Sequence, residues 1–548
     1  MSVCLSAFYF NEVFSAVFQT GPEVDKEYLP TIFNDIEHEK LESVRFPQET
    51  VYKKLIDLKP HSAPGADNIT PLFLKACATE VSLPLSLIFE KSMEEGRLPP
   101  IWKKMNITPI HKGGRQEIPE NYRPINVSSI PCKVKESIIK DALLLHLTQN
   151  ELLLSSQHGF VPGRSCTTNL LMYLNEVMTA LDAGIVDFRR AFDVVPFEHM
   201  LSHLEAHGVG VQLLAWMRNW TEQRKQRVVL NGHCSDWADV ISSVVQGSVL
   251  GPILFIIFIN SMDFAIKDPN TNIFKYADDS KIGRHIRNEA DAKTLQASLD
   301  EVCKWAEKSG MQLHPAKSVV LHFGYNNPRH EYTIAGEPVS NSGVAKDLGV
   351  LVNEQCTPRD HVNKVIKKGN QILGQLKRTI ISRDPIVFPR IFKTYVRPIL
   401  ETAAPAWCPL AKGEIERLEK VQRRATKLIP TISSKPYEER YTLCNLPTLE
   451  ERRARGDMIQ TFKILNGFTN IQPSKLFKFT KDRHELNTRN SATNALVPER
   501  SRLDIRKSFF ANRIVEQWND LPPDVRNAES VNHFKNSFDD YMTTLNCI

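Results

Sequence analysis

Two adjacent carboxylates, Asp278 and Asp279, constrain this chain more than any other feature of its sequence. They follow the apolar run Ile273 to Tyr276 and precede another apolar residue, Ile282. The pattern predicts a β-hairpin with both acids at its tip. Neighbouring carboxylates repel each other unless a cation or donor lies close by, so the pair suggests a divalent metal ion. The alternative is a solvated Asp-Asp turn, because Asp is common in turns.

A second acidic position precedes the first in the chain. The residues Ile185 to Phe188 predict the end of a short β-rich run, and Arg189 to Asp193 then lead into a turn or the start of a helix. We therefore expect Asp187 at a strand terminus, where its side chain can meet the tip of a neighbouring hairpin.

A glycine-rich loop, Gln246 to Pro252, lies between the two acidic segments and is followed by the apolar run Ile253 to Ile259. This order predicts a loop that opens a buried helix, where the backbone can approach a ligand closely. A tight turn before a core helix is the alternative.

In this order, the three segments resemble motifs A, B and C of a reverse transcriptase. The wider match resembles the non-LTR retrotransposon enzymes of the jockey and CR1 type. It covers roughly residues 45 to 470 and is carried by these further segments: His61 to Asp67, Asn121 to Ile125, His158 to Phe160, Gly163 to Ser165, Lys346 to Val350, Val396 to Glu401, Val421 to Thr426 and Glu451 to Arg453.

The resemblance implies an α+β right-hand polymerase fold, with fingers, a palm built on an antiparallel sheet, and a helical thumb. We expect an N-terminal helical segment at 1–45, fingers and palm at 46–353, and a basic, helical thumb-like and C-terminal region at 354–548. Helical spacing in Thr50 to Leu58 and the hairpin signal Asn231-Gly232 agree with a mixed α+β region before residue 354.

Two amphipathic helices after residue 354 carry a basic face. The cations are Lys364, Lys367, Lys368, Lys377 and Arg378 in the first, and Arg417, Lys420, Arg423, Arg424 and Lys427 in the second. Such charge runs are usually solvated helix faces. In a polymerase, the same helices would grip the phosphate backbone.

The activity that the resemblance implies is RNA-directed DNA polymerisation, in which a primer 3′-hydroxyl is extended with deoxynucleoside triphosphates on an RNA template. Such phosphoryl transfer uses two cations roughly 4 Å apart. Asp187 and Asp278 are the expected ligands and Asp279 a supporting acid, with the carbonyl of Phe188 completing one coordination sphere. Two Mg²⁺ ions suit these hard oxygen ligands, and Mn²⁺ could substitute.

Further roles follow from the resemblance alone. Phe192 matches the aromatic residue that excludes a ribose 2′-hydroxyl, although an ordinary core Phe is the alternative. Gln246 and Gly247 match the loop that packs against the incoming nucleotide and template. Arg123 and Lys112 would bind the triphosphate. Lys317 would donate a proton to pyrophosphate, or else is a solvated surface lysine.

Composition limits the setting without identifying the protein. A length of 548 residues with 42% hydrophobic residues permits a large core and several domains. The net charge is only +6, so a nucleic-acid surface must come from local clustering. Ten scattered cysteines without a CxxC pair favour reduced thiols in an intracellular setting. The family resemblance further implies the nucleus or a cytoplasmic ribonucleoprotein. No membrane partner is expected, because every apolar run is shorter than the ~20 residues that span a bilayer. The oligomeric state is left open.

One departure from the family pattern bears on activity. Only Ile185 and Val186 separate Gly184 from Asp187, whereas the related enzymes have a longer strand there. A truncated strand would misplace Asp187, and an error of even 1 Å can cost on the order of 10² in rate. The alternative function is therefore a catalytically inactive, nucleic-acid-binding relic of such an element.

An RNA-templated RNA polymerase is disfavoured by Phe192. Neither an endonuclease before the fingers nor an RNase H after residue 354 is expected.

Overall fold

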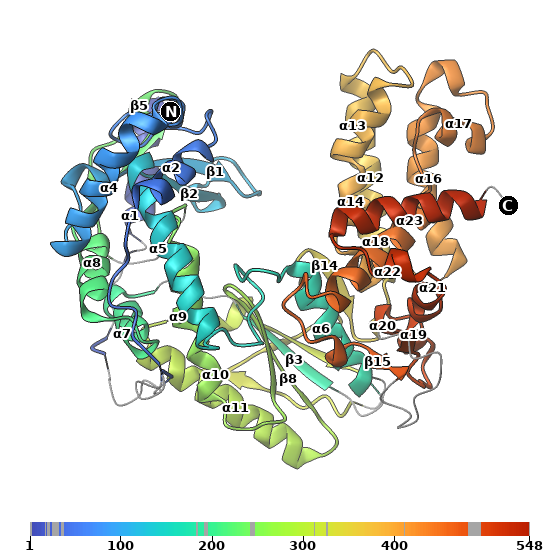
Figure 1. The fold of residues 1–548 in the computed structure, drawn as a ribbon. Coiled ribbons are helices and arrows are strands. Elements are labelled where there is room, and N and C mark those ends of the chain that lie inside the picture. Colours follow the sequence, from blue (N-terminus) through green and yellow to red (C-terminus); the bar gives the residue numbers. More distant parts are fainter. Residues whose placement is uncertain are drawn as a thin grey trace.

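Two arms rise from a common base in this protein (Figure 1). The computed structural model describes residues 3–16, 18, 22–24, 32–33, 38–181, 185–190, 195–241, 247–311, 313–324, 327–409, 411–480 and 495–546, without the side chains of 3–5, 185–190 and 546. The first arm contains the N-terminal residues, the second arm contains the C-terminal ones, and the base holds the sheet that carries the candidate site.

The first arm packs helices around a small mixed sheet. Its sheet has the order β2-β1-β4-β5, and β6 also pairs with β4. Its elements are α1 (Val3–Ser15), α2 (Gln48–Ile56), α3 (Pro71–Ala76), α4 (Ala78–Glu94), β1 (Lys104–His111), β2 (Tyr122–Val127), α5 (Ile130–Gln149), α8 (Val211–Thr221), β4 (Arg224–Leu230), β5 (His233–Cys234) and β6 (Ala238–Val240). The predicted Asn231-Gly232 hairpin is confirmed, since both turn residues have positive φ, 49° and 82°.

The base is built on a five-stranded sheet with the order β12-β9-β3-β8-β7. Only β12 and β9 run parallel; the other pairs are antiparallel. The strands are β3 (Ile185–Arg190), β7 (Asn272–Tyr276), β8 (Asp279–His285), β9 (Val319–Phe323) and β12 (Ser340–Asn341), and the helices are α6 (Cys166–Ala180), α7 (Phe197–Ala206), α9 (Gly251–Asn260), α10 (Met262–Ala265) and α11 (Glu289–Lys308). The predicted buried helix after the glycine-rich loop is α9, which is apolar on all sides and therefore lies in the core.

The two faces of this sheet belong to different hydrophobic cores. Ile282 and Val320 pack with α9 and α11 in the core that continues into the first arm. Leu321 and Phe323 pack with α6 in the core that continues into the second arm. The sheet therefore connects the two arms mechanically.

The second arm is almost entirely helical. Two short hairpins, β10 (Thr333–Ile334) with β11 (Glu337–Pro338) and β13 (Val344–Asp347) with β14 (Val350–Asn353), lead into it. It comprises α12 (Arg359–Thr379), α13 (Val387–Tyr395), α14 (Arg397–Glu401), α15 (Ala404–Trp407), α16 (Lys412–Lys427), α17 (Tyr437–Leu443), α18 (Leu449–Leu465), β15 (Lys478–Phe479), β16 (Leu496–Val497), α19 (Asp504–Lys507), α20 (Phe510–Arg513), α21 (Val515–Asn519), α22 (Pro523–Arg526) and α23 (Val531–Asn546).

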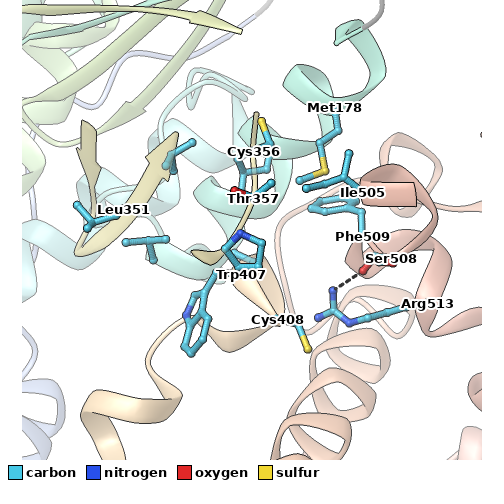
Figure 2. Close-up of a pocket in the computed structure, with 15 residues that line it drawn as sticks. Met178, Leu351, Cys356, Thr357, Trp407, Cys408, Ile505, Ser508, Phe509 and Arg513 are labelled. Atoms are coloured by element: carbon cyan, nitrogen blue, oxygen red, sulfur yellow. Dashed lines mark hydrogen bonds between the residues drawn. The ribbon is translucent and has the colours of Figure 1, made fainter. Parts of the chain in front are cut away.

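A small apolar pocket marks where the last helices meet α6 and β14. Figure 2 shows Met178 of α6 facing Ile505 and Phe509 across this pocket. Arg513 closes one side by donating hydrogen bonds to Asp457 of α18 at 2.9 and 3.0 Å. The C-terminal helices are thus packed onto the base as well as onto the second arm.

No helix in the described part of the chain is long and apolar enough to cross a membrane. The eight cysteines whose side chains are described are all free thiols.

Candidate active site

The predicted acid-tipped hairpin is present. β7 and β8 pair antiparallel up to Tyr276 opposite Asp279, so the turn consists of Ala277 and Asp278. Asp278 and Asp279 are both exposed to solvent. Ala277 adopts a left-handed conformation with φ of 55°, which is uncommon for a residue other than Gly, Asn or Asp and indicates a turn held by its surroundings.

Gln157 supplies one of the contacts that hold this turn. Its buried Oε1 accepts hydrogen bonds from the backbone N–H of Ala277, at 2.9 Å, and of Gly159, at 2.7 Å. A Cβ on Gly159 would lie 2.4 Å from the backbone nitrogen of Ala277, so only glycine permits this approach. The segment around Gln157 runs beside β7, with a parallel bridge to Lys275.

Asn169 of α6 joins the two strands of the hairpin. Its fully buried side chain donates to the carbonyl of Lys275 in β7, at 3.1 Å, and accepts from Nζ of Lys281 in β8, at 2.5 Å. Lys281 Nζ also donates to Asp347, at 2.9 Å, and lies over the ring of Tyr173, 4.3 Å from its centroid. A buried charged network therefore fixes the hairpin against α6 and the β13–β14 turn.

Lys275 makes a second buried ion pair on the other side of the hairpin. Its Nζ donates to Asp263 at 2.5 Å and to the carbonyl of Ile259 at 3.2 Å. Burial lowers the pKa of Lys275, and the carboxylate of Asp263 opposes that shift. Sequence reasoning missed Lys275, Lys281 and Asn169, although a lysine inside an apolar strand is a signal that a buried partner is required.

The turn tyrosine has a partner too. The hydrogen bond between the Tyr276 hydroxyl and Cys166, together with burial, raises the pKa of Tyr276 to about 12. Tyr276 therefore stays protonated at neutral pH and anchors the turn to the first residue of α6.

Asp187 lies elsewhere in its strand than expected. It was predicted at a strand terminus, but β3 continues to Arg190, because β3 pairs with β8 on one side and β9 on the other. Asp187 is opposite Gly283 of β8, four residues from Asp279. At about 3.3 Å per residue, this offset is about 13 Å along the sheet.

The acid pair at the turn offers exposed oxygen ligands. No group of three or more His, Cys, Asp or Glu side chains that could hold a metal ion occurs among the described residues. The exposed oxygens of Asp278 and Asp279 suit one hard cation.

Three other predicted residues lie on the β1–β2 hairpin or pack against it: Lys112, Arg123 and Gly247. Lys112 and Arg123 are exposed near the tip of the β1–β2 hairpin, where the Lys112 N–H donates to the carbonyl of Asn121 at 2.7 Å. Gly247, with φ of 103°, packs so tightly on β2 that a Cβ would lie 2.7 Å from the carbonyl oxygen of Asn126. The glycine-rich loop thus contacts the strand that carries Arg123.

Lys317 lies at the same end of the strands of the main sheet as the acid pair. It is exposed, two residues before β9, which begins opposite Arg189, while Arg190 is opposite Ser280 next to Asp279. The backbone of Phe188 lies opposite Ile282 and Val320. Phe192 and Gln246 lie outside the described residues.

A basic surface extends over α12 and α16. Arg417 and Arg424 donate to Asn363 and Asn370 of α12, at 2.6 and 2.9 Å, so the polar faces of the two helices adjoin. Of the cations predicted for this basic surface, Lys364 is half-buried and the exposed ones are Lys367, Lys368, Lys377, Arg378, Arg417, Lys420, Arg423, Arg424 and Lys427.

Comparison with known proteins identifies the class. Residues 110–362, which contain the hairpin, α9 and all of the main sheet, match the family model of the reverse transcriptase (RNA-dependent DNA polymerase). The matched residues make up a little less than half of the chain.

Several relatives of the chain come from transposons. The chain is 27% identical over 440 residues to a probable RNA-directed DNA polymerase from transposon BS of Drosophila melanogaster, covering 74% of this chain and 47% of that protein. It is 27% identical over 420 residues to the RNA-directed DNA polymerase from mobile element jockey of Drosophila funebris, covering 71% and 44%. The chain is thus similar to RNA-directed DNA polymerases of transposons, and it spans less than half the length of these two relatives.

Proposed function

We propose that this chain is an RNA-directed DNA polymerase that extends a primer 3′-hydroxyl with deoxynucleotides on an RNA template. The observation that carries the proposal is the exposed Asp278-Asp279 pair on a rigidly held turn within the residues that match the reverse transcriptase family. Buried bonds from Gln157 and Asn169 preorganise this turn. Charge placed in advance, rather than recruited during the reaction, is the main way in which enzymes stabilise phosphoryl transfer.

The three parts of the molecule correspond to the parts of a right hand. In this proposal, the first arm forms the fingers, the base forms the palm, and the second arm forms the thumb (Figure 1). The RNA template and DNA primer would lie between the arms, with the basic surface of α12 and α16 against the phosphate backbone. Use of a chromosomal DNA target would place this activity in the nucleus.

Each predicted side chain then has a role. Asp278 and Asp279, with Asp187, would hold Mg²⁺ or Mn²⁺, which supplies Lewis-acid activation and charge neutralisation when bound. In the backbone register of β3, Asp187 lies opposite Gly283, four positions from Asp279. Arg123 and Lys112 would bind the triphosphate, and Lys317 would protonate pyrophosphate. Gln246 and Gly247 would contact the nucleotide, Phe188 would add a carbonyl ligand, and Phe192 would exclude ribonucleotides.

Primer extension tests the proposed activity. The full chain is incubated with an RNA template, an annealed DNA primer, deoxynucleotides and Mg²⁺, beside the isosteric variants Asp278→Asn and Asp279→Asn. We expect extension that falls by at least about 10²-fold in the Asp278→Asn variant, since one ligand charge is lost. The exposed Asp300→Asn on α11 is the control. Extension that survives in both hairpin variants would remove the acid pair from the mechanism.

The register of β3 favours a second candidate, a catalytically inactive protein that binds nucleic acid. In the register found, Asp187 is about 13 Å along the sheet from the position opposite Asp279. Retained binding of the RNA–DNA duplex with no extension by the unaltered chain would support this candidate over the polymerase.

A further inference from the structure

Arg164 lies between Gln157, which holds the acid-tipped hairpin, and the C-terminal region. Its Nη1 donates to the carbonyl oxygens of Leu154, at 2.6 Å, and Gln157, at 2.5 Å. Its Nε donates to the carbonyl oxygen of Asn470, at 3.1 Å, in the segment after α18. One planar guanidinium therefore joins the backbone near Gln157 to that of Asn470, which is 306 residues after Arg164 in the chain.

The same contact is reinforced by the residue before Arg164. The backbone N–H of Asn470 donates to the carbonyl of Gly163 at 3.1 Å. Gly163 has φ of 74°, and a Cβ there would lie 2.9 Å from the Asn470 nitrogen. Both the conformation and the close approach require glycine. We call this set, Gly163, Arg164 and Asn470, the Arg164 junction.

Gln157 connects the Arg164 junction to the turn. Arg164 fixes the backbone of Gln157, and the side chain of Gln157 accepts the N–H of Ala277, next to Asp278. A change at Asn470 is therefore two hydrogen-bonded residues away from the acid-bearing turn. Asn470 lies beyond residue 362, where the match to the reverse transcriptase family ends.

A second contact supports the same geometry. Asn175 of α6 donates to the carbonyl of Lys475 at 3.1 Å and accepts from Arg506 at 2.8 Å. Together with the apolar pocket between Met178 and Phe509 (Figure 2), these bonds hold the C-terminal region against the helix that carries Asn169.

We propose that the C-terminal region positions the acid pair through the Arg164 junction, so that Gly163, Arg164 and Asn470 are positioning residues for Asp278 and Asp279. This inference rests on the proposed polymerase function for its catalytic meaning. Its structural part, the coupling of Asn470 to the hairpin turn, can be tested without any activity.

Hydrogen exchange of the full chain measures that coupling. Gly163→Ala and Arg164→Ala are compared with the unaltered chain at peptides covering 272–282 and 466–475. The control is Gly336→Ala, because Gly336 has a similar φ of 80° but nothing within 4 Å of a Cβ. Both junction variants should exchange about tenfold faster at 276–279, the effect of losing about one net hydrogen bond, and the control should not.

The outcomes separate the proposal from a merely structural contact. Faster exchange at 466–475 with unchanged exchange at 276–279 would overturn the proposal, because the junction would then be released without moving the turn. If Arg164→Ala fails to fold, Arg164→Lys keeps the charge but loses the fork, and it should show the same pattern more weakly.

Primer extension adds the catalytic readout. In both junction variants, kcat should fall about tenfold while KM for the primer–template changes less than twofold, because the bound duplex contacts other residues. A rise in KM alone would assign the junction to substrate binding and overturn the positioning role. Absence of extension by the unaltered chain would count against the proposed function, whereas the exchange result would still decide the coupling.

Discussion

Lys281 forms a buried ion pair beneath the acid-tipped hairpin. Its side chain and that of Asp347 are each only 4% exposed and form an ion pair at 2.9 Å. Breaking a buried pair on one side leaves a buried charge without its counterion, which costs about 3–5 kcal/mol. We therefore expect Lys281→Met to lower the free energy of unfolding by that amount, as measured by guanidinium denaturation.

Two further variants make this result specific. Lys281→Met combined with Asp347→Leu should recover much of the loss, since neither charge then remains buried. Lys293→Met, which breaks an exposed pair with Glu289 on α11, should cost less than about 1 kcal/mol. An equal cost at Lys281 and Lys293 would contradict the buried network.

His158 gives the stability a pH dependence. Burial, with the nearby charges of Arg164 and Lys281, lowers the pKa of His158 to about 3 in the folded protein. The unfolded chain takes up a proton below about pH 6.5, whereas folded His158 does not, so stability is lost as the pH falls from about 6.5 toward 3. At pH 5 the loss is about 2 kcal/mol.

The variant His158→Gln removes that contribution. Between pH 7.5 and 5.0 the unaltered chain should lose about 2 kcal/mol more unfolding free energy than His158→Gln does. The exposed His233→Gln should behave as the unaltered chain. Identical pH profiles for all three proteins would mean that His158 is solvated in solution.

At the residue scale, the sequence predicts structure set by neighbouring residues and misses contacts between residues far apart in the chain. The Asp278-Asp279 turn was recognisable because both strands of its hairpin adjoin it in the chain. Lys281 could not be assigned, because its partner Asp347 is 66 residues away and lysine is rarely buried.

The strand β3 poses the main question at the scale of elements. The sequence predicted a short strand before Asp187, and in the structure Asp187 lies opposite Gly283 rather than at the end of β3. Register could not be predicted, because β3 pairs with strands about a hundred residues away and no local turn fixes it. By contrast, the Asn231-Gly232 hairpin has its register set by its own turn.

Lengthening β3 tests whether this register limits activity. Insertion of four strand-forming residues between Gly184 and Ile185 would let Asp187 move by four positions, to the place opposite Asp279. Because four is even, each side chain keeps its face of the sheet. We expect the rate of primer extension to rise by at least about tenfold, because misplacing a catalytic group by even 1 Å can lower the rate about 10²-fold.

The matched control is an insertion of three residues at the same place. It supplies nearly the same length but reverses the face of every following side chain, so it should not raise activity. If both insertions leave extension unchanged while duplex binding persists, the register of β3 is not what limits this chain.

At the scale of the whole molecule, the main sheet is the part that both arms share. Its two faces pack into separate cores, one continuous with the first arm and one with the second. A duplex held between the arms would therefore press on the sheet that carries the acid pair. This arrangement follows from long-range packing, so the sequence predicted the helices of the second arm but not their contact with α6 at Asn175 and Met178.

The basic surface provides the last prediction, the salt dependence of duplex binding. Lys420 and Lys427 are exposed on the side of α16 that adjoins α12. Each lysine that neutralises a phosphate adds about 0.7–0.9 to the slope of log Kd against log salt. Lys420→Gln with Lys427→Gln should thus flatten the slope by about 1.5, as measured by fluorescence anisotropy with an RNA–DNA duplex at several KCl concentrations.

A pair of lysines on the base gives the comparison that this experiment needs. Lys293 and Lys304 are exposed on α11, in the base of the molecule (Figure 1). Each forms an ion pair with a glutamate of the same helix. Their double replacement by Gln changes the net charge equally but should leave the slope unchanged, since counterion release depends on phosphates contacted and not on total charge. If both double variants flatten the slope alike, the duplex senses overall charge and the basic surface is an ordinary solvated face.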